Sequence, residues 1–295
     1  MDFNVFTDNI VNVLQQRMGH EYDVKVTKVT KNNDIELTGV VLMKESDNLS
    51  PTIYLDGLFE EYQDGAYIED LAEQIIRLYK EQLPAGRLDM DFFRNFEQVK
   101  DRIFYKLVSY DKNRKMLEKL PYYKWNDLAI IFYYAMEEER IGRASITIHH
   151  QHLKMWEQSL DTLYAVAQEN MKKSMPELLV SMKDLLEETT GLKMGEDTYL
   201  PMYVLTNQEK VYGAAAMLYS EHMKKLAERW QTDLLILPSS IHEVLLLPDD
   251  GQNEYAFYRQ MVEEVNTTQV EPEEVLSYSL YRYCREKAEI EEILS

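Results

Sequence analysis

Residues 238–243 (PSSIHE) unite two hydroxyls, an imidazole and a carboxylate, the groups that nucleophilic hydrolysis uses. Such catalysis needs a hydroxyl within hydrogen-bond reach of a base, with donors nearby for the developing oxyanion. Apolar runs flank the segment, and neighbouring strand residues point to opposite faces, so His242 and Glu243 cannot simply act together. The alternative is a structured turn, in which Ser239 and Ser240 cap backbone amides and His242 bonds a carbonyl. We favour the turn and keep these four residues as candidates for catalysis.

Three histidines stand close together at positions 149, 150 and 152. In a strand, His150 and His152 point to the same face and could bind a first-row transition metal if a third ligand came from elsewhere. No carboxylate stands at a helical spacing to complete the set. We therefore favour a polar strand end, expect no cofactor, and predict that the purified protein carries no stoichiometric zinc. His222, beside an apolar helix face, and His20, at a helix exit, are expected to be structural.

Complete motifs of several large enzyme classes are missing. No glycine-rich phosphate loop of the form GxGxxG or GxxxxGKS/T occurs among the 10 glycines, and neither HExxH nor GxSxG is present. Nucleotide-dependent enzymes, nicotinamide dehydrogenases, zincins and α/β-hydrolases are therefore disfavoured. The single cysteine, Cys284, excludes an internal disulfide and a four-thiolate zinc site, and we expect it to be a packed, inert thiol.

Acidic residues outnumber basic ones by 52 to 32, which gives a net charge of -20. Such a surface repels nucleic-acid phosphates unless a basic patch is set apart. The densest basic stretch, residues 112–119, also holds Glu118, so we do not expect direct nucleic-acid binding. We attribute the charge to solubility, with an acidic face that binds a basic partner or imitates DNA as the alternative.

The apolar content points to a folded protein that stays in the cytoplasm. The chain has 295 residues, 45% of them hydrophobic, which is enough for one large core or two adjoining ones. Residues 1–19 lack a basic leader with an unbroken apolar run, so we expect no signal peptide. The longest apolar run, residues 128–136, is far shorter than the roughly 20 residues that span a membrane.

The N-terminal third reads as a helix, a hairpin and more helices. Apolar residues at helical spacing predict a helix that ends at Gly19, and alternation on both sides of the turn cluster 32–34 predicts a β-hairpin. A short strand at 51–55 and acidic helices up to Tyr79 follow. Residues 83–89 (LPAGRLD) are the best candidate linker, because Pro and Gly break both regular structures.

The rest of the chain mixes helices and strands. The continuous apolar run 127–136 predicts a central strand covered on both faces. We expect other strands at 104–110, 144–150, 202–205, 234–237, 244–247 and 278–283. We expect helices at 92–103, 160–171, from Pro176 to Leu186, from the capping-box pattern at 206–209 to Trp230, at 255–265, and a short charged helix at the end.

These elements predict an α+β fold with mixed or antiparallel sheet segments flanked by amphipathic helices. Strict strand-helix-strand alternation is absent, which disfavours a doubly wound sheet. We expect an N-terminal hairpin-and-helix region at residues 1–84 and a main α+β region at 85–295. One continuous domain over residues 1–295 is the alternative.

Several segments together resemble a known family. They are KLVSY at 106–110, Asn113, Pro121-Tyr122, DLA at 127–129, YVLTN at 203–207, Gly213-Ala214 and, most specific, PSSIHE at 238–243. The chain resembles the domain-of-unknown-function family 5688, uncharacterised proteins of gut Firmicutes, over nearly its full length. The resemblance implies a bacterial, cytoplasmic protein whose fold occupies the whole chain, and it carries over no catalytic role.

The sequence leads to a function mainly by elimination. A well-packed, acidic chain without a catalytic motif favours a non-enzymatic cytoplasmic protein that binds another protein. A hydrolase or metal-binding enzyme that uses the PSSIHE segment, with His150 and His152, is one alternative. An acidic DNA-mimic inhibitor is another. Convergence of the histidines and Glu243 around one cleft would favour the enzyme.

Overall fold

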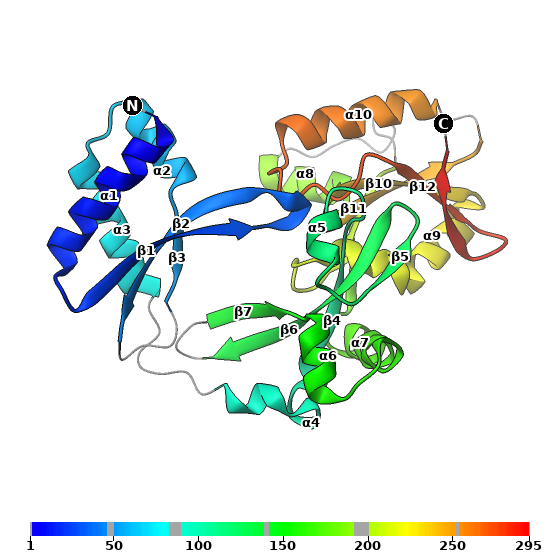
Figure 1. Cartoon of the computed structure of the whole chain (residues 1–295). Coiled ribbons are helices and arrows are strands. Elements are labelled where there is room, and N and C mark those ends of the chain that lie inside the picture. Colours follow the sequence, from blue (N-terminus) through cyan, green and yellow to red (C-terminus); the bar gives the residue numbers. More distant parts are fainter. Residues whose placement is uncertain are drawn as a thin grey trace. The chain divides into compact units, whose positions relative to one another are not determined.

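The computed structural model describes residues 2–45, 50–82, 90–138, 142–191, 201–251 and 254–294 (Figure 1). The α+β prediction is confirmed. Within these residues the strands form three sheets, and the strand registers that the structure gives are all antiparallel. The linker expected at 83–89, and with it the expected boundary between residues 84 and 85, lies outside the described residues.

The chain divides into two compact units. The first comprises Met1–Lys31, Ile35–Arg94 and Met136–Ala144, and the second comprises Asn32–Asp34, Asn95–Ala135 and Ser145–Ser295. Each unit is described by itself below.

The first unit contains the predicted helix, hairpin and short strand. Its elements are α1 (Phe3–Met18), β1 (Tyr22–Thr30), β2 (Glu36–Lys44), β3 (Thr52–Tyr54), α2 (Asp56–Gln63), α3 (Ile68–Gln82) and the 3-10 turn η2 (Asp91–Arg94). Asp2 caps α1 by accepting a hydrogen bond from the Val5 amide, and Gly19 ends the helix with a φ of 78°. One apolar face of α1 packs with β2 and α3, and Phe6, Ile10 and Leu14 are fully buried there.

A sheet that lies mostly in the second unit is built around one buried strand, and its residues 136–144 are assigned to the first unit. Its strands are β4 (Ile103–Ser109), β5 (Tyr122–Trp125), β6 (Leu128–Glu138) and β7 (Gly142–Thr147). β6 pairs with β4 along one edge and with β5 and β7 along the other. Residues 128–134 of β6 are all buried, so the predicted central strand is confirmed.

The longest sheet of the second unit has six strands in the order β13-β12-β10-β11-β9-β8. They are β8 (Glu177–Ser181), β9 (Tyr203–Asn207), β10 (Asp233–Ser240), β11 (Glu243–Asp249), β12 (Leu280–Cys284) and β13 (Glu289–Ile293). β10 and β11 form the predicted antiparallel hairpin. Figure 1 shows α10 (Tyr255–Thr268) lying along this sheet, where Tyr258 and Val262 pack on Leu235 and Leu237.

The remaining helical segments surround these two sheets. They are η1 (Asn32–Asp34), α4 (Phe96–Val99), η3 (Lys100–Arg102), α5 (Arg114–Leu117), α6 (His150–Trp156), α7 (Leu160–Ser174), α8 (Met182–Thr190), η4 (Gly213–Leu218) and α9 (Glu221–Trp230). α7 packs on β4, and the Asn170 side chain fixes it there by donating to the carbonyls of Lys100 and Ile103.

Residues 32–34 form the turn between β1 and β2, and they belong to the second unit. Asn33 has a left-handed φ of 62°, and its amide donates to the buried Asn113 side chain at 2.7 Å. The Asn33 side chain in turn donates to the carbonyls of Pro272 and Val275, each at 2.8 Å.

Four predicted elements are wrong, and strand pairing with other segments of the chain accounts for three of them, now β8, β9 and β13. Pro176 precedes strand β8, and a helix begins only at Met182. The capping-box pattern at Thr206 lies in β9, and α9 is capped by Ser220 instead. The helix expected at 92–103 is broken into short turns, and the expected terminal helix is strand β13.

Within the described residues, no helix combines the length and the apolar character needed to cross a bilayer.

Candidate functional site

The PSSIHE segment forms the tight turn between β10 and β11. The strand register shifts between Pro238 and Ser240, and Ser240 then pairs with Glu243. Ser240 is 9% exposed, and its hydroxyl accepts a hydrogen bond from the His242 amide at 3.0 Å. Ser239 and Glu243 are half-buried. The segment has the local geometry of the turn predicted from the sequence, with a serine hydroxyl capping a backbone amide.

The imidazole of His242 has a protein partner at each ring nitrogen. Nδ1 accepts a hydrogen bond from the Tyr212 amide at 3.1 Å, and Nε2 lies 3.3 Å from the Glu274 carboxylate. Because Nδ1 accepts, Nε2 is the nitrogen that carries a hydrogen, and it faces the Glu274 carboxylate. The ring also stacks on Tyr212, with centroids 5.7 Å apart and an angle of 14°. Neither nitrogen is free to act as a base toward a substrate in this arrangement.

The loop that leads from β9 to η4 wraps around this histidine. Thr206 donates its hydroxyl hydrogen to the His242 carbonyl at 2.8 Å. Tyr212 adopts a left-handed φ of 53°, and the Lys106 ammonium lies 3.9 Å from the centroid of its ring. A Cβ on Gly213 would overlap the Thr206 hydroxyl and the His242 carbonyl, so only glycine allows this close approach. Sequence reasoning missed the loop because Thr206 and His242 are 36 residues apart.

The three clustered histidines lie at the start of a helix, so the prediction that His150 and His152 share a strand face is wrong. β7 ends at Thr147, and α6 begins at His150 with His149 as its N-cap. The His149 amide donates to Nδ1 of His152 at 3.2 Å. Burial is the main cause that lowers the pKa of both His149 and His152. Among the residues that the structure describes, no group of three or more His, Cys, Asp or Glu side chains is placed to hold a metal ion.

The structure places these histidines on α6 and His242 on the β10–β11 turn, which are separate elements. The cavity described next has none of them in its lining. The convergence on one cleft that would have favoured an enzyme is therefore not seen at that cavity.

A cavity of about 820 Å³ opens in the second unit, and no sequence motif marks it. Its walls come from β4, β5, α7, β8, η4, α9, β12 and β13, including Tyr105, Trp125, Lys172, Tyr219, Lys224 and Tyr283. Its size is within the range of small-molecule sites, about 300–1,000 Å³. Because single residues from many elements build it, spacing along the chain gives no signal for it.

One carboxylate in the cavity lining is already engaged. Glu177 accepts hydrogen bonds from the amides of Glu221 and His222 at 3.1 and 3.2 Å, at the start of α9. Its carboxylate also lies 2.6 Å from Nδ1 of His222. The negative charge of Glu177 is therefore directed at the helix N-terminus, where such a charge is favourable.

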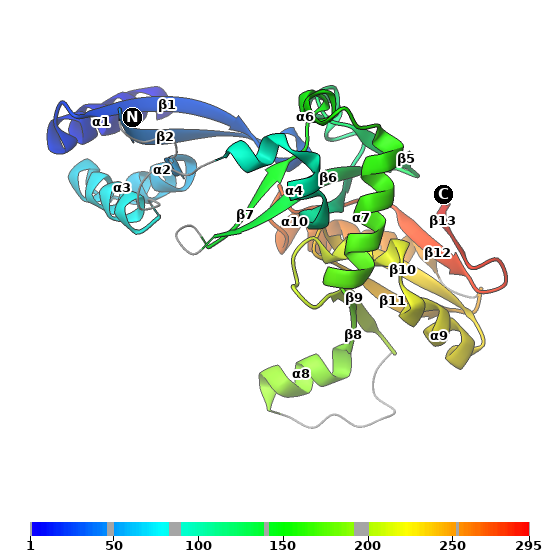
Figure 2. The same ribbon diagram turned by 90° about the horizontal axis from the view of Figure 1, so that it is seen from below.

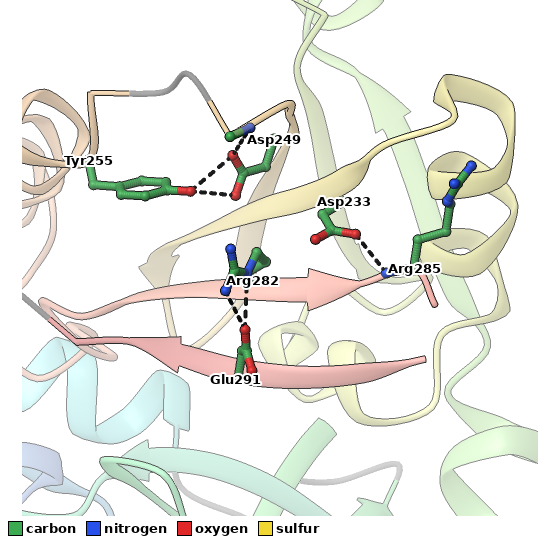
Figure 3. A network of polar contacts seen from close by, with 7 residues as sticks. Asp233, Asp249, Tyr255, Arg282, Arg285 and Glu291 are labelled. Atoms are coloured by element: carbon green, nitrogen blue, oxygen red, sulfur yellow. Dashed lines mark hydrogen bonds and ion pairs between the residues drawn. The ribbon is translucent and has the colours of Figure 1, made fainter. Parts of the chain in front are cut away.

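A polar network ties the strands of the long sheet to α10 (Figure 3). Asp249 is 4% exposed, and the Tyr255 hydroxyl donates its one hydrogen to this carboxylate, whose two oxygens lie 2.9 and 3.1 Å away. Arg282 pairs with Glu291 directly across β12 and β13, at 2.5 Å, and lowers the pKa of that carboxyl. Each acid in this network has a hydrogen-bond or ion-pair partner, so the network serves to hold these strands and α10 together.

Strand β8 and helix α8 form an arm at the far edge of the long sheet, Glu177–Thr190. Among the strands that the structure describes, β8 pairs with β9 alone and is the last strand in the order. α8 has no buried residue, although Met182, Leu185 and Leu186 share one face. Figure 2 shows α8 standing away from the other helices of the second unit.

Comparison with known proteins gives one result. Neither the curated proteins nor the solved structures include a match to this chain. A family model described as a family of unknown function (DUF5688) matches residues 3–285, which is nearly the whole chain. The likeness seen in the sequence is thereby confirmed, and the chain belongs to the family of unknown function DUF5688.

Proposed function

We propose that this protein is a non-enzymatic, cytoplasmic binding module that recognises another protein through the β8–α8 arm. The observation that supports the proposal is an amphipathic helix of nine residues, α8, none of whose side chains is buried. A helix this short is marginal in water without tertiary packing. Its apolar face therefore gains a partner when the arm binds.

The strand of the arm offers a second means of attachment. Every residue of β8 is half-buried, and its outer edge is the end of the six-stranded sheet. An edge strand presents unpaired amide and carbonyl groups that can pair with a strand of another chain. β8 and α8 together thus present both backbone and apolar groups to a partner.

The charge of the arm indicates the kind of partner. Glu177, Asp184, Glu187 and Glu188 lie on it with a single lysine, Lys183, which pairs with Glu187 at 4.0 Å. A second copy of this chain would bring like charges together, within a protein whose net charge is already -20. We therefore commit to a different protein, with an apolar groove rimmed by lysine and arginine.

The two alternative functions, a hydrolase and a DNA mimic, require different groups of the protein. A hydrolase built on residues 238–243 needs His242 as a base, whereas both ring nitrogens are engaged. A DNA mimic acts through exposed carboxylates and does not need an apolar helix face. The experiment below separates the binding module from the DNA mimic.

The experiment is affinity capture from an extract of the native host, followed by mass spectrometry. The double variant Leu185→Asp/Leu186→Asp should reduce recovery of the partner at least about tenfold, the effect of roughly 1.4 kcal/mol of lost binding energy. The matched control is Val211→Asp/Phe257→Asp, which places the same two charges on exposed apolar residues elsewhere. It should leave recovery unchanged.

Three outcomes would overturn the proposal. A partner kept by the Leu185/Leu186 variant binds elsewhere, and a DNA-binding partner kept by it would support the mimic. Loss of the partner from both variants would show that the added negative charges weaken binding wherever they are placed. A partner without a basic surface would contradict the predicted recognition.

A further inference from the structure

The cavity in the second unit is lined by a hydroxyl without a hydrogen-bond partner in the protein. Tyr105 lines the cavity, is 1% exposed as a residue, and contacts the rings of Tyr164 and Tyr219. Within the described part of the chain, its hydroxyl makes no hydrogen bond. It is therefore available to bond a water molecule or a ligand in the cavity. Burial also raises the pKa of Tyr105, which keeps the hydroxyl protonated as a donor.

Two cations stand at the same cavity. Lys172 on α7 and Lys224 on α9 both line it, and both are exposed. Among the residues that the structure describes, neither ammonium group forms an ion pair. This contrasts with Lys44 and Lys100, whose ammonium groups contact neighbouring carboxylates. An anion entering the cavity would meet two lysines that no protein carboxylate neutralises.

Two acids, Glu177 and Glu221, also line the cavity. Glu177 is held by the amides at the start of α9 and by His222. Glu221 is exposed on the first turn of α9, where the helix N-terminus favours a carboxylate. The lysines therefore remain the groups available to an anionic ligand.

Aromatic side chains form part of the apolar wall, together with aliphatic residues such as Met217, Leu218 and Ile290. Trp125 stacks on Tyr281, with centroids 5.8 Å apart and an angle of 29°, and lines the cavity from β5. Tyr283 lines it from β12 and is 7% exposed. The Tyr219 hydroxyl donates to the Met175 carbonyl at 2.7 Å, which fixes that ring. Fixed aromatic side chains beside lysines suit a planar ring that carries a negative charge.

We propose that this cavity binds a small aromatic anion, a planar ring bearing a phosphate or carboxylate group. The anionic group pairs with Lys172 and Lys224, the Tyr105 hydroxyl donates a hydrogen bond to the ligand, and the ring packs against Trp125 and Tyr283. The cavity shares Glu177 with the β8–α8 arm, but no residue of α8 lines it. The two proposals are tested by different variants, so either can fail without the other.

The test is a ligand-observed NMR titration of the full chain with four probes. Phenyl phosphate and benzoate carry both the ring and the anion, whereas phenol and inorganic phosphate each carry one part. We expect at least one of the first two to bind with a Kd of about 0.1–1 mM. Phenol and inorganic phosphate should bind about tenfold more weakly or not at all. The tighter of phenyl phosphate and benzoate identifies the anionic group.

Variants assign the binding to the cavity. Lys172→Ala/Lys224→Ala should weaken it at least tenfold, while Lys173→Ala/Lys225→Ala removes the same charge from the next positions, outside the lining. Tyr105→Phe should weaken binding several-fold yet leave the melting temperature of the free protein equal or higher, because the hydroxyl it removes bonds no group of the protein.

The proposal is overturned if neither aromatic anion binds at millimolar concentration. It is also overturned if the Lys173/Lys225 control weakens binding as much as the Lys172/Lys224 variant. Equal affinity for phenyl phosphate and inorganic phosphate would remove the role of the aromatic wall. A lower melting temperature for free Tyr105→Phe would make that hydroxyl structural.

Discussion

The backbone amide of Tyr212 donates a hydrogen bond to Nδ1 of His242, a residue 30 positions further along the chain, at 3.1 Å. The same imidazole stacks on the Tyr212 ring and points its other nitrogen at Glu274. One side chain thus links three loops of the second unit. Its removal leaves a backbone amide and a carboxylate without their partner.

We therefore predict that His242→Ala lowers the free energy of unfolding by about 1–3 kcal/mol, the usual cost of leaving buried polar partners unbonded. Ser240→Ala should cost less, since it loses only the hydrogen bond from the His242 amide. Ser239→Ala should cost least, because Ser239 is half-buried and water can replace its contacts. Denaturant melts of the three variants measure these differences. Parent-like stability of all three, together with a lost cellular phenotype, would show that the segment is a functional site.

Gly213→Ala should destabilise the protein by about 1–3 kcal/mol, because the added methyl group overlaps the His242 carbonyl and the Asn207 amide. Those are backbone atoms, which cannot turn aside as a flexible side chain does. Gly57→Ala in α2 is the matched control, since nothing lies within 4 Å of its Cβ position. It should be neutral or stabilising by helix propensity. Equal melting temperatures for the two variants would contradict the tight approach at Gly213.

Acidification should destabilise the protein through His152. Burial lowers its pKa below the ordinary value of 6.5, so the unfolded chain binds a proton more readily than the folded one. The stabilisation is present above about pH 6.5 and is lost as the pH falls through that range. Protonating Nδ1 also breaks the hydrogen bond from the His149 amide.

His152→Asn keeps an acceptor but cannot titrate, so its urea midpoint should change less than that of the parent between about pH 7 and pH 5. His20→Asn, which removes an exposed histidine, serves as the control. A parent-like pH dependence in His152→Asn would refute the assignment.

We also predict that the purified protein holds no stoichiometric zinc. His149 and His152 interact with each other through a backbone hydrogen bond, and Nδ1 of His152 is occupied by it. Elemental analysis should give well under one equivalent per chain. About one equivalent, lost in His150→Ala or His152→Ala, would show that the histidines do ligate a metal.

Elements whose patterns depend on residues close together in the chain were predicted correctly from the sequence. The apolar run in β6 and the six-residue gap between two apolar stretches at β10 and β11 correctly predicted a central strand and a hairpin. The turn at Asn32–Asp34 was readable because asparagine and aspartate tolerate left-handed backbone.

Patterns that depend on distant partners were misread. The Thr206 hydroxyl donates to the His242 carbonyl instead of capping a helix, and β9 continues through that position. Pro176 is typical of a helix start, but Leu178 and Leu179 pair with β9 as a strand. The cavity around Tyr105 could not be predicted at all, since its walls are brought together only by the packing of many elements.

The turn at Asn32–Asp34 and the segment Met136–Ala144 each belong to a different unit from the residues on either side of them. During synthesis on the ribosome, the first unit therefore lacks part of its chain until residue 144 has emerged. Asn33 in this turn cannot form its hydrogen bonds until Asn113, Pro272 and Val275 have been synthesised. Pro272 and Val275 lie near the C-terminal end of the chain. Nascent chains halted before residue 144 should thus be protease-sensitive in both units. Neither unit can fold fully at that point, because each still lacks segments that are synthesised later.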